Sequence, residues 1–157
     1  GLSYPNGSYS KDIINLLPAC GIEYSRVVGS TDDFAFPDNF LEWKSTCHHG
    51  HNLIQNAERF ADLHKTQYLY MMYVWGHSYE FDRDNSWDLI EGFCKFIGGR
   101  DDIWYATNIE IVDYMNAAKN LKYTAKGDRV YNPNAISVWI EVDGQHYEIK
   151  PGELKEI

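Results

Sequence analysis

The sequence is poor in cysteine and in basic residues and has no long apolar run, and each shortage excludes a class of protein. Its three cysteines, Cys20, Cys47 and Cys94, form neither an even disulfide framework nor a paired zinc spacing. Cys20 and Cys94 lie among apolar residues at helical spacing, which predicts buried free thiols. No stretch approaches the roughly 18 apolar residues of a transmembrane helix, so we expect no membrane span.

Basic side chains are outnumbered, because 14 Lys and Arg stand against 23 Asp and Glu, a formal net charge of −9. Affinity for nucleic acid depends on neutralising phosphates, so this balance argues against a nucleic-acid partner. It also disfavours anionic membranes and leaves neutral or cationic partners. Aromatic residues are abundant at 15% of the chain, and they suit either a thick core or faces that stack on sugars.

Helical and strand patterns alternate along most of the chain, which predicts an α/β fold with mainly parallel strands and helices packed outside them. Segments with apolar residues three and four apart are expected to be helices, namely 10–21, 53–63, 87–97 and 107–121. Short apolar runs are expected to be strands, namely 22–28, 67–75 and 103–106. Residues 29–50 have no sustained period and are expected to form a long surface loop, and a polar loop should follow His77.

The C-terminal tail has a different pattern. Residues 135–142 and 145–149 flank Asp143-Gly144, a strong signal for a two-residue hairpin turn. This pattern predicts a small antiparallel β-hairpin appendix. We therefore expect residues 1–121 to form the α/β part and residues 122–157 to pack on it as the appendix.

The first candidate for chemistry is Trp75-Gly76-His77, which ends the most apolar of the expected strands. Active sites of α/β folds lie at the carboxyl ends of their strands. A histidine side chain is the usual proton donor near neutral pH, so His77 is a candidate acid, although a structural histidine is an equal alternative from the spacing alone. Glu80 and Asp82 share the loop after His77, and either could orient its imidazole.

The second candidate is Cys47-His48-His49-Gly50-His51, where four potential metal ligands fall within five residues. Structural zinc sites usually join two separated pairs of ligands, and adjacent residues cannot all face one ion without distortion. A polar loop or a rim facing the substrate is the stronger interpretation. His48, His49 and His51 are therefore kept only as weak candidates for metal binding.

Taken in order, these segments resemble the polysaccharide deacetylases of the NodB-homology, carbohydrate-esterase type. The segment 4–9, Tyr-Pro-Asn-Gly-Ser-Tyr, followed by a helix and by Gly-Ile-Glu-Tyr at 21–24, is similar to the family's third motif. The segment 75–80, Trp-Gly-His-Ser-Tyr-Glu, is similar to its fifth motif, in the form that one branch of bacterial deacetylases carries. The resemblance covers residues 3–115, and the tail also looks like that branch.

The resemblance implies a function and roles for the residues at matching positions. It implies a hydrolase that removes acetyl groups from a polysaccharide with a divalent metal such as zinc. His77 would be the general acid, and Trp75 would wall the acetyl pocket. The residues that it implies to contact substrate are Tyr4, Pro5, Gly7, Trp75, Tyr79 and Glu80. A polysaccharide substrate favours an exported protein, periplasmic or extracellular.

Two motifs of the family do not occur in these 157 residues. The first, Thr-Phe-Asp-Asp-Gly, supplies the catalytic base and a metal ligand, and the second, His-Ser/Thr-x-x-His, supplies two further ligands. The Arg of the third motif would fall at Ser3. Because the chain begins where the third motif begins, we expect the C-terminal part of a deacetylase domain.

That expectation has three consequences. The fold would be a partial β/α barrel, and the chain would lack the family's metal ligands and be inactive by itself. Sheet edges left exposed would favour a homodimer. The alternative is a non-catalytic carbohydrate-binding or structural remnant of the same fold.

Overall fold

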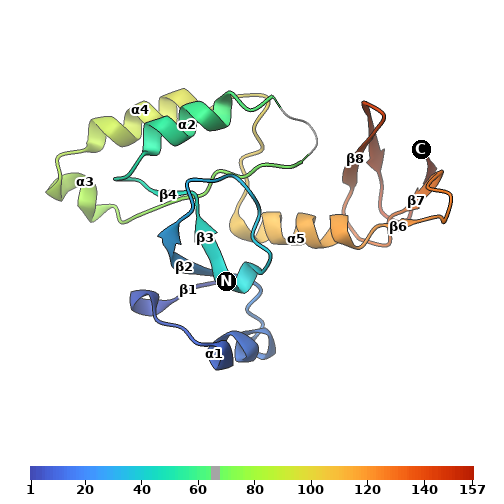
Figure 1. Cartoon of the computed structure of the whole chain (residues 1–157), viewed down its shortest axis with the longest axis horizontal. Helices are drawn as coiled ribbons and strands as arrows, with labels where there is room; N and C mark the ends of the chain where they lie inside the picture. Colours follow the sequence, from blue (N-terminus) through green and yellow to red (C-terminus); the bar gives the residue numbers. More distant parts are fainter. Residues whose placement is uncertain (65–67) are drawn as a thin grey trace. The chain divides into compact units, whose positions relative to one another are not determined.

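Short strands and helices alternate along the first two thirds of the chain, as Figure 1 shows. The computed structural model describes residues 1–64 and 68–157. They divide into two compact units, Gly1–Tyr105 and Ala106–Ile157. The α/β class is confirmed as a mixture of helices and several small sheets, and the described residues form no closed barrel.

The first unit has two parallel sheets. Its strands are β1 Leu2–Ser3, β2 Ser25–Ser30, β3 Trp43–Ser45, β4 Cys47–His48 and β5 Val74–Trp75. Its α-helices are α1 Lys11–Leu16, α2 Leu53–Ala61, α3 Tyr79–Arg83 and α4 Trp87–Ile97, and its 3₁₀ turns are η1 Pro5–Gly7, η2 Leu17–Cys20 and η3 Phe40–Glu42. β1, β2 and β3 form one sheet in that order, and β4 pairs with β5 in the other. All these pairs are parallel, as the alternation predicts.

The helix signals of the first unit are confirmed at the level of single residues. The Ser10 side chain accepts a hydrogen bond from the Ile13 amide at the start of α1. Pro18 lies in the first turn of η2, so the helix tightens there, and Gly21 ends it in the left-handed region at φ 73°. Helices α2 and α4 lie within the expected segments and run side by side in Figure 1.

The strand predictions were less accurate. The expected loop 29–50 contains η3, β3 and β4, and the expected polar loop after His77 contains α3. Of the expected strand 67–75 only β5 forms, while Tyr68 and Leu69 are exposed and Gln67 lies outside the described residues. No strand forms at 103–106. Strands of two or three residues are too short for periodicity to reveal, because tertiary packing decides them.

The core of the first unit is aromatic around Trp43, which is fully buried. The Trp43 ring packs edge-on against Phe40 at 4.9 Å and in a tilted arrangement against Tyr73 at 5.0 Å between centroids. The cysteine prediction is wrong, because Cys20 and Cys94 are exposed and Cys47, on β4, is the buried one. A helical spacing places a residue near an apolar stripe but does not say how far the neighbouring elements cover it.

The second unit begins with α5, Asn108–Lys119, whose Thr107 and Glu110 form the expected capping box. The expected hairpin is confirmed as β8 Val138–Val142 and β9 Gln145–Ile149, and both turn residues, Asp143 and Gly144, have positive φ. A three-stranded antiparallel sheet, which we did not predict, joins β6 Lys122–Tyr123, β7 Arg129–Tyr131 and β10 Leu154–Glu156. The helix α5 belongs to this compact unit, and the expected division into residues 1–121 and 122–157 stays a prediction.

A small apolar cluster and one buried amide hold the second unit together. The cluster consists of Ala117, Leu121, Val130, Val138 and Ile149. Asn132 is fully buried, and its Nδ2 donates to the carbonyls of Ile136 and Ile149 at 2.8 Å each. Its Oδ1 accepts from the Asn134 amide at 2.9 Å. No helix of the described residues is both long and apolar enough to cross a membrane.

Replacing Asn132 with Ala should destabilise the second unit by about 1–3 kcal/mol, because it leaves buried carbonyls without donors. Denaturant unfolding of the full chain measures the change. Asn116→Ala is the matched control, since Asn116 is exposed on α5 and a helical Ala should be neutral or slightly stabilising. Equal stability of the two variants would contradict the role assigned to Asn132.

Candidate functional site

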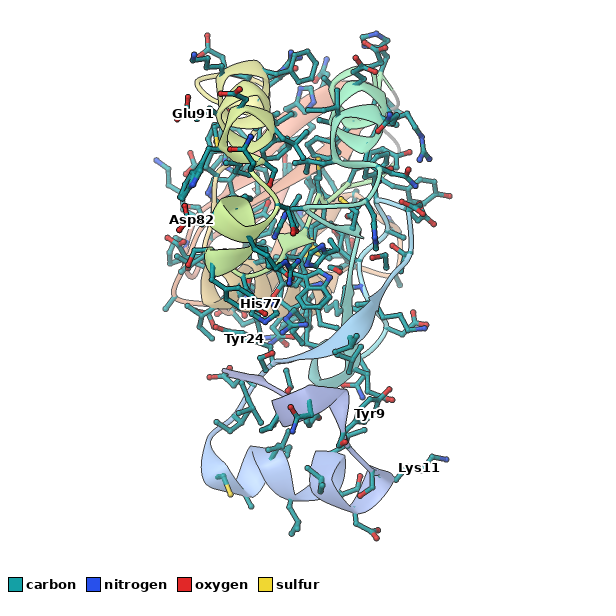
Figure 2. The ribbon with its side chains drawn as sticks, turned by 90° about the vertical axis from the view of Figure 1, so that its left-hand side faces the viewer. Tyr9, Lys11, Tyr24, His77, Asp82 and Glu91 are labelled. Carbon is teal, nitrogen blue, oxygen red and sulfur yellow. The ribbon has the colours of Figure 1, made fainter. Side chains whose placement is uncertain are left out.

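The parallel pairing of β4 with β5 brings the two histidine-containing segments to one edge of a sheet. Cys47 pairs with Val74 and His48 with Trp75, so both strands end at the same level. His49 and His77 therefore leave the sheet side by side at its carboxyl edge, which is where α/β folds carry their chemistry. Figure 2 shows His77 just below α3 within a dense group of side chains.

One carboxylate oxygen, Oε2 of Glu80, is the centre of this group. It lies 2.8 Å from Nε2 of His49 and 3.0 Å from Nε2 of His48. It also accepts the backbone N–H of His77 at 3.1 Å and lies 3.4 Å from Nδ1 of the same residue. Glu80 reaches this position because α3 starts at Tyr79, two residues after His77, and turns its first acidic residue back toward β5.

The hydrogen bonds assign the tautomer of His48. The backbone N–H of Gly50 donates to Nδ1 of His48 at 3.1 Å, so Nδ1 presents its lone pair. The proton of the neutral ring is therefore on Nε2, which points at Glu80. Nδ1 of His49 is buried without a hydrogen-bond partner, which costs less for a lone pair than for a buried N–H. His49 is thus also assigned as an Nε2–H donor to Glu80.

The same contacts test whether the group fits a metal ion. His48, His49 and Glu80 each offer a ligand atom, and these atoms lie within 4.8 Å of one another. A metal-bound imidazole coordinates through a lone pair and usually donates its other N–H to a neighbouring acceptor. Here Nδ1 of His48 accepts instead of donating, and Nδ1 of His49 has no acceptor nearby. The arrangement fits a hydrogen-bonded carboxylate and does not fit a metal centre.

The electrostatics agree with an ionised Glu80. Burial by itself would raise the pKa of this carboxyl, but the hydrogen bonds from the His77 backbone and from His49, together with the charge interaction with His48, lower the pKa to about 2. Burial lowers the pKa of His48, and the neighbouring His49 lowers it further, which favours the neutral ring. Backbone and imidazole N–H groups therefore stabilise Oε2 of this buried carboxylate, while the exposed guanidinium of Arg83 lies 3.6 Å from Oε1.

His77 is the open member of the group. Half of its side chain is exposed, whereas the side chains of His48, His49 and Glu80 are mostly covered. Because Nδ1 faces Glu80, Nε2 is the ring nitrogen left for a proton transfer to another molecule. Of the two acidic residues that could orient His77, the structure selects Glu80, because Asp82 instead accepts from Nε1 of Trp87 at 2.8 Å.

Trp75 forms a wall beside the histidines. Its ring meets His48 edge-on at 4.7 Å, and the guanidinium of Arg26 lies 4.2 Å above the ring centroid. Arg26 also donates to the side chain of Ser3, its partner across the β1–β2 pair. A guanidinium from β2 therefore lies beside the position where the resemblance expects an arginine. Tyr79 is exposed and its ring lies 5.2 Å from that of His77.

The remaining sequence candidates lie outside the histidine group. Tyr4 is buried, packs against Ile14 and Val27, and donates its hydroxyl to the Leu41 carbonyl, so its ring is a core element. Pro5 and Gly7 both lie in η1, where Pro5 is exposed and Gly7 is half-buried. His51 is exposed, and its ring lies 5.7 Å from that of His48 without joining the carboxylate. The substrate contacts expected of Tyr4, Pro5 and Gly7 stay predictions.

All four residues of the group were candidates from the sequence, but they were not predicted to lie together. His48 and His49 were weak metal candidates, while His77 and Glu80 were assigned to a separate site. A parallel strand at Cys47-His48, beside the one that ends at Trp75, would have predicted that the two candidates lie together. The carboxyl ends of parallel strands share an edge.

Comparison with known proteins identifies no relative: no protein-family model matches the chain, and no curated protein or solved structure matches it.

Gly76→Ala should disrupt the site, because a Cβ at position 76 would overlap the imidazole of His49. The ring would have to leave Glu80, so we expect a lower melting temperature and altered NMR signals of His49. Gly92→Ala is the matched control, since a Cβ there has no neighbour within 4 Å and α4 gains a better helix former. A Gly76→Ala protein as stable as Gly92→Ala would contradict the close packing of His49.

Acid should weaken the site through Glu80. Its pKa is lowered to about 2 in the folded chain, so the carboxylate contributes stability above its ordinary pKa of 4.5, and this contribution is lost as the pH falls from 4.5 toward 2. The difference in melting temperature between the unsubstituted protein and Glu80→Gln should therefore be largest above pH 4.5 and shrink below it. Glu91→Gln, an exposed change on α4, should show no such trend. A difference for Glu80→Gln that does not vary with pH would refute this assignment.

Proposed function

We propose that this chain is the C-terminal part of a metal-dependent polysaccharide deacetylase, a partial β/α barrel in which His77 is the general acid. The observation that carries the proposal is the pairing of a half-exposed His77 with the ionised Glu80 at the carboxyl edge of parallel strands. The residues at 75–80 that resemble the family's fifth motif supply both members of this pair.

The pair suits protonation of a leaving group. Hydrolysis of an acetyl group adds a water oxygen to the carbonyl carbon, breaks the bond to the sugar nitrogen or oxygen, and releases acetate. The departing atom needs a proton, and Nε2 of His77 is the exposed donor. The negative Glu80 beside Nδ1 stabilises the imidazolium until the proton leaves, as an oriented carboxylate does for a catalytic histidine.

The described residues do not provide the metal ligands and the general base that deacetylation also needs. In metal hydrolases a bound metal polarises the carbonyl and activates the water. The group His48–His49–Glu80 does not fit that role, because its imidazoles act as N–H donors. Residues 1–157 alone should therefore release no acetate, and the base and metal ligands must come from outside these residues.

Acetate release is the direct test. The chain 1–157, and under the proposal a longer natural protein that contains it, are incubated with acetylated chito-oligosaccharide and acetylxylan, with zinc or cobalt added. We expect turnover by the natural protein, inhibited by a chelator, and none by residues 1–157. Absence of turnover on every acetylated glycan by a folded, metal-loaded natural protein would reject the proposal.

In the natural protein, His77→Ala should lower kcat by roughly 10²–10⁴-fold, the usual contribution of a general acid, with a smaller effect on KM. His146→Ala is the matched control, because His146 is an exposed histidine that lies 3.3 Å from Glu141 in the hairpin. A kcat for His77→Ala equal to that of the control would show that His77 is not the acid.

A non-catalytic carbohydrate-binding role is the second candidate, and the exposed aromatic rings favour it. Large aromatic side chains with much of their surface exposed offer stacking faces for sugars, namely Tyr79, Trp104, Tyr105, Tyr123 and Trp139. Under this alternative, glycan binding would occur without acetate release and would be insensitive to a chelator. The acetate assay, run beside a binding measurement, separates the two candidates.

A further inference from the structure

We infer that His48 and His49 are positioning residues for His77: by donating to Glu80 they fix the tautomer of His77 with its proton on Nδ1. The consequence for catalysis rests on the proposed function, whereas the tautomer itself is a property of the folded chain. An acid–carboxylate pair needs no further histidines for its chemistry. The role of His48 and His49, in the Cys47–His51 segment, is therefore to orient that pair.

The first step is that the imidazoles of His48 and His49 hold the carboxylate more closely than the imidazole of His77 does. The Nε2 atoms of His49 and His48 make the shorter contacts with Oε2 of Glu80, at 2.8 and 3.0 Å, while Nδ1 of His77 lies at 3.4 Å. His49 is buried and packs against the Phe81 ring at 4.4 Å, so it can move little. The His77 ring, by contrast, is half exposed and lies 5.2 Å from the exposed ring of Tyr79.

The second step is that His48 and His49 both donate to the same oxygen of Glu80, Oε2. The amide of Gly50 holds Nδ1 of His48, which commits Nε2–H of that ring to Oε2. Oε2 then receives His48, His49 and the His77 amide, and it is the oxygen that faces Nδ1 of His77. An anionic oxygen at that distance favours a proton on Nδ1 and leaves the lone pair of the neutral ring on Nε2.

The third step concerns where the carboxylate would go without these donors. The other oxygen, Oε1, lies 3.6 Å from Nη2 of Arg83, whose side chain is more than half exposed. Removing the imidazole N–H groups would leave Oε2 with the His77 backbone N–H as its main donor, opposed at Oε1 by this guanidinium, which also binds Asp84. The carboxylate would turn outward, and the neutral ring of His77 would lose the contact that holds its proton on Nδ1.

The test is the tautomer of His77, read from the ring ¹⁵N shifts of ¹⁵N-histidine-labelled chain 1–157 above the pH at which its imidazole titrates. The unsubstituted chain should show neutral His77 with the proton on Nδ1. His48→Phe with His49→Phe keeps planar rings but removes both N–H donors, and should shift the population toward Nε2–H. His48→Gln with His49→Gln retains N–H donors and should preserve more of the Nδ1–H form.

Several outcomes would overturn the inference. One is an unsubstituted chain whose neutral His77 carries its proton on Nε2, a result that requires no variant to fold. Another is a folded double Phe variant whose His77 remains in the Nδ1–H form. A third is equal loss of that form in the Phe and Gln variants, which would indicate packing and not donation. His146, exposed in the hairpin, serves as the internal reference and should not change.

A measurement of activity distinguishes a failure of this inference from a failure of the proposed function. In the natural protein the double Phe variant should lower kcat with KM unchanged, because an imidazolium that has lost its contact with Glu80 is less well oriented and less stabilised. A tautomer shift in a protein that deacetylates nothing would uphold the positioning and reject the deacetylase. Full activity of a variant whose tautomer has shifted would reject the positioning role and leave the deacetylase intact.

Discussion

The arrangement of the first unit depends on a single buried anion, the carboxylate of Glu80, and on the histidines that surround it. A carboxylate removed from water is costly unless several donors replace the water. Here His48 and His49 approach from one segment, and the His77 amide and ring from another. Satisfying this anion therefore joins β4 to the segment after β5 and determines which nitrogen of the exposed histidine faces out.

The backbone makes that convergence feasible. Parallel pairing of β4 with β5 puts His48 level with Trp75, and the absence of a side chain at Gly76 leaves room for the ring of His49. The short helix α3 then returns Glu80 to the edge of the sheet. Only together do these features produce a carboxylate with an exposed histidine on one side and two covered histidines on the other.

Local signals explain why some of this could be predicted from the sequence. Ser10, Gly21, the Thr107–Glu110 box and Asp143-Gly144 act through contacts with near neighbours in the chain, so their elements were expected and are present. β3, β4 and β5 are held by pairing partners far along the chain and are too short to show a period. The site was therefore predicted as two separate candidates, and the burial of Tyr4 and exposure of Cys20 and Cys94 were not foreseen.

The central claim is that Glu80 is held by imidazole N–H donors, so that His77 presents Nε2 for proton transfer. A neutron crystal structure of the chain, grown in the presence of zinc at a pH where the imidazoles are neutral, tests it most directly. The account predicts deuterium on Nε2 of His48 and His49 and on Nδ1 of His77, with no metal between the rings. A zinc ion bound to His48, His49 and Glu80, or deuterium on Nε2 of His77 with Nδ1 bare, would contradict it.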